Sequence, residues 1–319
     1  MEHQSAKIIA PFTFSAFRLS IRATEPLYLP AYKGSALRGS FGHALRKVAC
    51  VVMDKECKNC LLAPRCVYAF VFEPRPDEDD PFLRNKDRVA NPYIIRPPLE
   101  KREEYKPGEK LSFELILVGK ISEYLPYFVY AFMQMGQRGL GRGRFMLERI
   151  DNLKADGSLM PVYLSDDQIL RNESEPITCR DLLEIFPPRE QCRFRFLTRL
   201  ELKEKRKYPE VRFGVLFRSL LRRITTLAHL HCGISCTDID FKILSHAADD
   251  VRTLSSDLRW EHAVRYSNRQ KRCMPFGGLV GNVTFEGDLT LFWPFILLGE
   301  WMHMGKKTSF GLGRYLIEN

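Results

Sequence analysis

His43 and Lys47 are the pair of residues best placed for acid–base chemistry in this sequence. They lie in residues 34–50, where apolar residues recur with helical spacing, and residues four apart are neighbours on a helix surface. At about 100° per residue, the apolar residues share one side and His43 falls on the opposite side. Those apolar residues are Leu37, Phe41, Ala44, Leu45 and Val48. An imidazole exchanges protons near neutral pH, and an adjacent ammonium offsets negative charge, so the pair predicts a proton-transfer site. The alternative is an ordinary surface histidine.

Four cysteines follow this helix closely: Cys50, Cys57, Cys60 and Cys66. Cys57 and Cys60 have the two-residue spacing of a chelating turn, and four thiolates can close a tetrahedral zinc site. The pattern predicts a structural zinc, with an iron–sulfur cluster or free cysteines in a loop as the alternatives. A histidine that binds metal cannot also act as a base. We therefore prefer four thiolate ligands, which leave His43 free.

One glycine-rich phrase occurs twice in the sequence. Residues 132–145 and 301–315 align with a one-residue gap, and each copy holds an apolar helical stretch, a basic glycine-rich loop and a short strand. Because glycine lets backbone N–H groups approach closely, such loops with cationic side chains are suited to phosphates. Two copies indicate two related domains and a polyanion rather than one nucleotide.

The charge balance also favours a polyanionic partner. Among 319 residues, 49 Lys and Arg stand against 39 Asp and Glu, giving a net charge of +10, although basic charge alone also serves solubility. The first ten residues lack the apolar core of a signal peptide, and the most apolar run, 289–298, is too short to span a bilayer. We therefore expect a cytoplasmic protein without membrane contact, whose cysteines are thiols or metal ligands.

Hydrophobic periodicity predicts the same order of strands and helices in both halves. In the first half the strands are residues 11–22, 93–96, 110–120 and 145–153, and the helices are 34–50 and 122–135. In the second half the strands are residues 193–202, 259–266, 279–285 and 310–317, and the helices are 210–230 and 294–304. This β-α-β-β-α-β order is the split βαβ arrangement of ferredoxin-like folds. Residues 240–258 fit no element.

The predicted fold class is therefore α+β, with two tandem ferredoxin-like domains. Prolines and polar residues gather within 165–190 and mark the boundary, which we place between residues 1–188 and 189–319. The first domain carries a cysteine-rich insertion at about residues 50–70.

Four segments of the sequence carry a family likeness: residues 37–43, 265–270, 277–281 and 305–315. With the duplicated fold, they resemble the RAMP superfamily of CRISPR systems, whose domains are RRM-like. More narrowly, the chain is similar to the endoribonuclease that cuts precursor guide RNA within CRISPR repeats, and the likeness covers nearly its whole length. The resemblance implies metal-independent cleavage that leaves a 2′,3′-cyclic phosphate and a 5′-hydroxyl. It also implies binding to repeat RNA and guide RNA, and to other effector subunits. Because non-cutting RAMP subunits share the C-terminal loop, the alternative is a subunit that only holds guide RNA.

The resemblance also assigns catalytic roles. Family members usually draw a histidine from the first helix, often with a tyrosine and a lysine. These would be His43, Lys47 and either Tyr28 or Tyr32, with Tyr28 preferred. Cleavage needs a base for the 2′-hydroxyl proton, an acid for the departing 5′-oxygen and a cation to offset charge on the phosphorane.

RNA contacts are expected in both glycine-rich loops and in the basic segment before residues 277–281. They are Lys306, Lys307, Thr308, Ser309, Gly311 and Gly313 in the second loop, Arg138, Arg142 and Arg144 in the first, and Arg265, Arg269, Lys271 and Arg272 in the basic segment. Phosphate contacts give salt-dependent affinity, whereas the choice of sequence or hairpin needs base contacts or shape. The sequence holds no standard aromatic RNA-recognition signature, so base stacking is not predicted.

Overall fold

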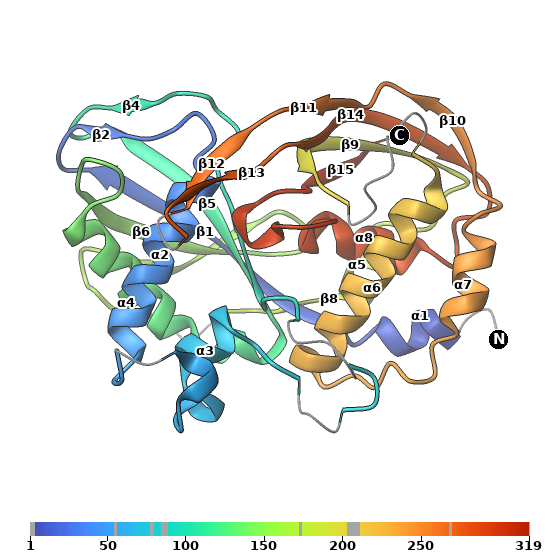
Figure 1. Ribbon diagram of the computed structural model, residues 1–319, viewed down its shortest axis with the longest axis horizontal. Coiled ribbons are helices and arrows are strands. Elements are labelled where there is room, and N and C mark those ends of the chain that lie inside the picture. The colour runs from blue at the N-terminus through green and yellow to red at the C-terminus, as the bar shows by residue number, and fades with distance from the viewer. Residues whose placement is uncertain are drawn as a thin grey trace. The chain divides into compact units, whose positions relative to one another are not determined.

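Two compact units make up the chain (Figure 1). The computed structural model describes residues 4–53, 56–76, 80–83, 89–171, 174–202, 211–267 and 270–318. The N-terminal domain consists of residues 13–177 with 230–232, and the C-terminal domain consists of the described residues in 4–12, 178–229 and 233–318. Within the described residues, no helix has the length and apolar character needed to cross a membrane.

An antiparallel sheet with strand order β3-β5-β1-β6-β7 forms the base of the N-terminal domain. Its strands are β1 (Thr13–Ala23), β3 (Tyr93–Arg96), β5 (Lys110–Val118), β6 (Phe145–Leu153) and β7 (Leu159–Leu164), and the short β8 (Ile177–Thr178) also pairs with β1. Helix α2 (Gly34–Ala49) follows β1, and helix α4 (Leu125–Arg138) follows β5. The predicted ferredoxin-like order is confirmed, and β7 extends the sheet by one strand beyond it.

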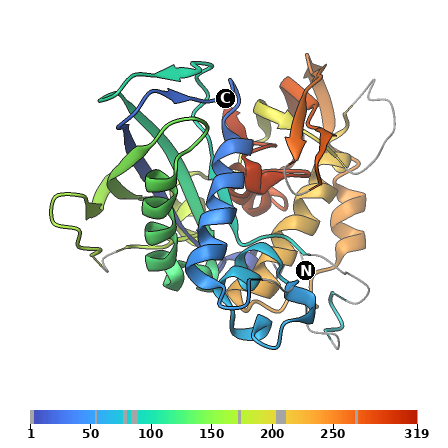
Figure 2. The ribbon, with the colours of Figure 1, turned by 60° about the vertical axis from the view of Figure 1, so that its left-hand side comes forward.

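Aromatic side chains fix α2 and α4 against each other, and Figure 2 shows the two helices side by side. The ring of Phe41 on α2 stacks on Phe132 and Phe128 of α4, with centroids 4.7 and 5.2 Å apart. It also meets Tyr93 of β3 edge-on at 5.8 Å. All four rings are buried, so this cluster determines which side of α2 faces the core.

The cysteine-bearing segment joins the same core. It forms two short 3₁₀ turns, η1 (Cys57–Asn59) and η2 (Ala63–Arg65), followed by helix α3 (Val67–Phe72). Val67, Val71 and Phe72 of α3 belong to the hydrophobic core of the domain. The predicted cysteine-rich insertion is therefore not confirmed as a separate unit, because its apolar half packs with the ferredoxin-like elements.

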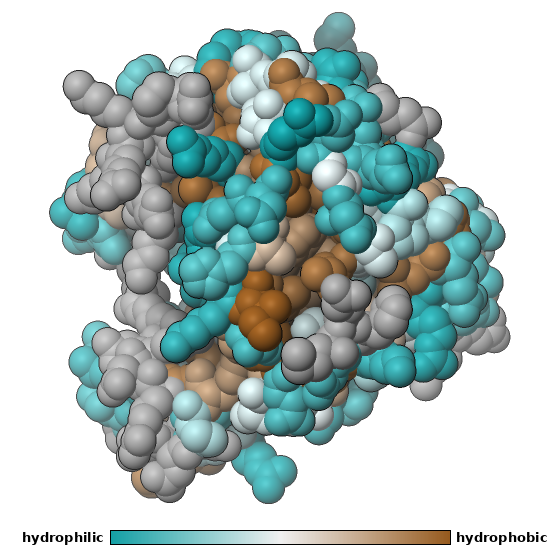
Figure 3. Space-filling view, turned by 90° about the vertical axis from the view of Figure 1, so that its right-hand side faces the viewer, coloured by the Kyte–Doolittle hydropathy of each residue, from teal (hydrophilic) through white to brown (hydrophobic). Residues whose placement is uncertain are grey.

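A second antiparallel sheet, β10-β14-β9-β15, forms the base of the C-terminal domain. Its strands are β9 (Gln191–Leu200), β10 (Arg252–Ser256), β14 (Gly278–Glu286) and β15 (Tyr315–Glu318), and β11 (Arg259–Glu261) also pairs with β14. The helices are α1 (Gln4–Ile9), α5 (Cys179–Ile185), α6 (Phe213–Cys232), α7 (Phe241–Ala247) and α8 (Trp293–Met302), with a 3₁₀ turn η4 (Thr308–Phe310). Figure 3 views the side that carries α7 and β10, where hydrophilic residues border an apolar area.

The second strand of this sheet differs from the prediction. It is β10, which lies inside residues 240–258, the segment that fitted no element. All five of its residues are exposed, so it lacks the apolar alternation by which a strand is recognised. The single strand predicted at 259–266 is two strands, β11 and β12 (Val264–Ser267). β12 pairs with β13 (Arg272–Pro275) as a separate two-stranded ribbon.

Candidate active site and nucleic-acid interface

Helix α2 presents His43 and Lys47 on its exposed side. Both side chains are exposed, whereas Leu37, Phe41 and Leu45 of the same helix are buried. This division follows the helical period because the aromatic cluster around Phe41 holds the apolar stripe against the core. Both groups are therefore open to a bound substrate, one able to transfer a proton and the other able to offset negative charge.

Hydrogen bonds tie the segment before α2 to residues 100–105. The Leu29 N–H donates to the Glu103 carbonyl at 2.8 Å, and the Ala31 N–H donates to the Glu103 carboxylate at 3.0 Å. The buried Lys33 ammonium donates to the Glu100 carbonyl at 2.9 Å. Burial lowers the pKa of Lys33, and the charges of Glu100 and Glu103 act in the opposite direction. The position of Lys33 was not predicted, since no periodic signal marks a buried lysine just before a helix.

Tyr28 stands on this tied segment, in β2 (Leu27–Tyr28), which pairs with β4 (Glu104–Tyr105). Its side chain is 48% exposed, and its hydroxyl lies 3.5 Å from the Glu104 carboxylate. In the described part of the chain, no hydrogen bond joins Tyr28 to His43 or Lys47. Tyr32, the other candidate, is half-buried. The choice of Tyr28 stays a prediction.

The first glycine-rich loop lies against the backbone that leads to Tyr28. Gly141 has φ +66°, and a Cβ there would lie 2.2 Å from the Tyr28 carbonyl oxygen. A Cβ on Gly143 would lie 2.2 Å from the Pro26 carbonyl oxygen. These glycines are thus required for close packing of two backbone segments. Arg142 and Arg144 project from the loop and are exposed, and Arg144 lies 3.6 Å from the carboxylate of Glu25.

The second loop packs onto the end of β9 in a similar way. A Cβ on Gly313, whose φ is +71°, would lie 1.8 Å from the Met304 carbonyl oxygen. The Thr198 hydroxyl donates to the Gly311 carbonyl at 2.8 Å. Four of the expected RNA contacts in this loop are buried: Thr308, Ser309, Gly311 and Gly313. The structure gives these residues a packing role, and their contact with RNA stays a prediction.

The two lysines of this loop share one acidic partner. The Lys306 ammonium lies 3.2 Å from one carboxylate oxygen of Glu201, and the Lys307 ammonium pairs with the other. Lys307 also donates to the Pro275 carbonyl at 2.6 Å. A phosphate would therefore compete with Glu201 for these cations.

The basic segment spans β12 and β13. Its Lys271 and Arg272 are exposed, whereas the half-buried Arg265 guanidinium lies 4.6 Å from the ring centroid of Phe310. Arg269 lies outside the described residues. The sequence did not predict that Tyr266, on the same ribbon, is an exposed aromatic residue, because an isolated tyrosine in a strand pattern gives no signal of its exposure.

The cysteines do not form a metal site in the described structure. Cys50, Cys57, Cys60 and Cys66 are free and half-buried. Burial, followed by the charge of Glu73, raises the pKa of the Cys57 thiol, which favours its protonated form. Within the described residues, no group of three or more His, Cys, Asp or Glu side chains is arranged to hold a metal ion. The predicted structural zinc is therefore not supported, and the same finding gives no support to an iron–sulfur cluster.

Two family models match different parts of the chain. Residues 12–175, more than half of the chain, match the AF_1859_N family, which is described as an N-terminal domain. Residues 194–315 match the family described as CRISPR-associated endoribonuclease Cas6. None of the curated proteins matches the sequence.

Solved structures share the fold at low sequence identity. Thermus thermophilus Cas6 (TTHB231) is 15% identical with a TM-score of 0.55, covering 96% of this chain and 99% of that chain. A Cas6 (TTHA0078) product complex is 16% identical with a TM-score of 0.52, covering 96% and 100%. A partial Cas6-RT-Cas1–Cas2 complex is 13% identical with a TM-score of 0.58, covering 96% of this chain and 46% of that chain. At these identities the likeness establishes the fold.

One substitution can test the close packing of the first glycine-rich loop against the backbone of Pro26. Gly143→Ala should destabilise the N-terminal domain by about 1–3 kcal/mol, because the new Cβ collides with the Pro26 carbonyl. Gly39→Ala on α2 is the control: apart from its neighbours and the helix's own backbone, no atom lies within 4 Å of the new Cβ. The substitution should therefore be neutral or stabilising by up to about 1 kcal/mol. Urea unfolding measures both changes, and equal stability of the two variants would contradict the packing role.

Proposed function

The chain belongs to the AF_1859_N family, and we propose that it is a RAMP-type CRISPR-associated endoribonuclease that cuts repeat RNA into guide RNAs without a catalytic metal ion. Cas6 enzymes are generally metal-independent, which supports this chemistry. The observation that carries the proposal is the exposed pair His43 and Lys47 on α2, because it supplies both a base and a cation on one helix face.

In the proposed reaction, the substrate provides its own nucleophile. His43 takes the proton of the ribose 2′-hydroxyl, and the resulting oxygen attacks the adjacent phosphorus. The bond from phosphorus to the 5′-oxygen of the next nucleotide breaks, leaving a 2′,3′-cyclic phosphate and a 5′-hydroxyl. Lys47 offsets the charge that develops on the phosphorane. Tyr28 is the proposed donor to the departing oxygen, and its place on a segment tied by Glu103 supports a fixed position.

The proposed substrate and partners follow from the family match and from the solved complexes. One similar structure is a Cas6 product complex and another is a complex with Cas1 and Cas2, which support repeat RNA as the substrate and other CRISPR proteins as partners. The residues of the two glycine-rich loops and of the basic segment remain the proposed RNA contacts. Among them the exposed cations are Arg138, Arg142, Arg144, Lys271, Arg272 and Lys306. We place the reaction in the cytoplasm.

Cleavage in the presence of EDTA tests the reaction class. Purified protein with excess EDTA should cut end-labelled repeat RNA, since none of the proposed steps uses a metal ion. A single 2′-deoxy nucleotide at the scissile position should block cleavage because it removes the nucleophile. Strict dependence on magnesium would contradict the mechanism, and tight binding without cleavage would favour the subunit that only holds guide RNA.

Replacing the proposed base tests its assignment. His43→Ala should slow single-turnover cleavage by roughly 100- to 10,000-fold, the usual contribution of general acid–base catalysis, and leave RNA affinity nearly unchanged. His246→Ala on α7 removes another exposed histidine and should leave the rate unchanged. If His43→Ala cleaves at the normal rate, the active site lies elsewhere.

Removing the carboxylate that holds the loop lysines tests their role in binding. Glu201→Gln should tighten RNA binding by roughly 3- to 10-fold at low salt and steepen its salt dependence, because Lys306 and Lys307 become available to phosphates. The control is Glu148→Gln: this carboxylate also lies between two cations, 2.9 Å from both Arg22 and Lys110. An equal effect of both variants would mean that only net charge matters.

A further inference from the structure

The ribbon of β12 and β13 has two unlike faces. Its register pairs Val264 with Pro275 and Tyr266 with Cys273, and directly opposed residues of a strand pair lie on the same face. These four residues form one face, which we call the outer face. The alternate residues, which include Arg265, form the inner face.

The inner face is anchored within the C-terminal domain. The Arg265 guanidinium stacks over the rings of Phe310 and Phe276, 4.6 and 5.6 Å from their centroids. The Phe276 N–H donates to the Ala263 carbonyl at 2.8 Å, and Lys307 binds the Pro275 carbonyl. The ribbon is therefore held from one side, which leaves the outer face free of these contacts.

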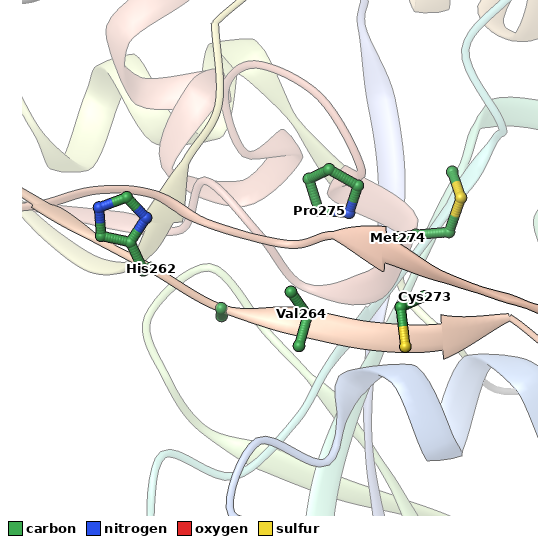
Figure 4. A pocket seen from close by; sticks show the side chains of 6 residues that line it. His262, Val264, Cys273, Met274 and Pro275 are labelled. Atoms are coloured by element: carbon green, nitrogen blue, oxygen red, sulfur yellow. The ribbon is translucent and has the colours of Figure 1, made fainter.

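The outer face is apolar and exposed. Val264 is 74% exposed and Tyr266 is 59% exposed, and Cys273 and Pro275 are also exposed. A shallow cavity of about 510 Å³ lies on this ribbon (Figure 4). It is lined by His262, Ala263, Val264, Cys273, Met274 and Pro275. Exposed apolar surface with an adjoining cavity is typical of a binding site.

Charge around the outer face identifies the chemistry of its ligand. Residues 262–275 contain four Lys or Arg residues and no Asp or Glu. Lys271, in the turn at the end of the ribbon, is exposed, and Arg272, which is also exposed, is opposed to Ser267 on the inner face. A ligand that suits this surface combines a flat apolar group with negative charge close beside it. An unpaired nucleotide has both, because its base can stack on an aromatic ring while its phosphate binds a cation.

We propose that the outer face of the β12–β13 ribbon binds an unpaired nucleotide of the substrate RNA, with its base stacked on Tyr266 and its phosphate directed to Lys271, in the turn between the two strands. The proposal rests on the proposed RNA substrate and adds a base contact to it. Phosphate contacts alone do not distinguish sequences, so this face also contributes to the choice of cleavage site.

Cys273 provides a direct probe of the outer face. It is the exposed cysteine among the nine of the chain, the others being half-buried or buried. N-ethylmaleimide alkylation of Cys273, followed by peptide mass spectrometry, is measured with and without repeat RNA that carries a 2′-deoxy scissile nucleotide. Saturating RNA should slow alkylation roughly 10-fold, and an abasic nucleotide at one position should restore the rate.

The same samples separate this proposal from the proposed function. If protein that cleaves the unmodified repeat is alkylated at the same rate with and without saturating RNA, the outer-face proposal is overturned and the nuclease proposal stands. Failure to bind RNA overturns both.

Substitution of Tyr266 distinguishes stacking from a phosphate contact. Tyr266→Ala should weaken RNA binding roughly 5- to 100-fold with an unchanged salt slope, and Tyr266→Phe should restore binding. The matched control Lys271→Gln should reduce the salt slope. With RNA that is abasic at the protecting position, wild type and Tyr266→Ala should bind equally, which a merely structural role would not produce. Urea unfolding checks that the Tyr266→Ala variant is folded. If the folded variant binds RNA as tightly as wild type, the proposal is wrong and the face serves a protein partner.

Discussion

The orientation of helix α2 depends on the burial of Phe41 among Phe128, Phe132 and Tyr93. These rings belong to the hydrophobic core of the N-terminal domain, and such aromatic contacts are sensitive to rotation of the helix. Because Phe41 faces the core, His43, two residues further along the helix, faces outward. The proposed chemistry therefore depends on a packing interaction that itself takes no part in the reaction.

In the two glycine-rich loops, the glycines are needed for backbone packing whether or not the loops bind RNA. In each loop, glycines allow backbone segments to approach at distances that a Cβ would prevent, Gly143 against Pro26 and Gly313 against Met304. The first loop supports the segment that carries Tyr28. In the second, the charges of Lys306 and Lys307 are paired with Glu201, so a phosphate bound there would compete with this carboxylate.

Binding and cleavage are thus assigned to different kinds of surface. In the proposed function, exposed cations on the loops and the basic segment supply RNA affinity that does not depend on sequence. The ribbon of β12 and β13 adds an apolar face with an exposed tyrosine, the proposed stacking surface for an RNA base. The proposed catalytic pair on α2 needs exposure and a fixed helix, and both follow from the core of the N-terminal domain.

The sequence by itself determined the two ferredoxin-like repeats, the family likeness and the outward position of His43, because periodicity and local motifs are properties of neighbouring residues. The tertiary structure decided the rest. Strand β10 forms from fully exposed residues that only its pairing with β14 identifies. The burial of the second glycine-rich loop against Thr198 and the Glu201 pairing arise from residues distant in the chain. No local pattern encodes such contacts, since they depend on which backbone segments meet in the folded domain.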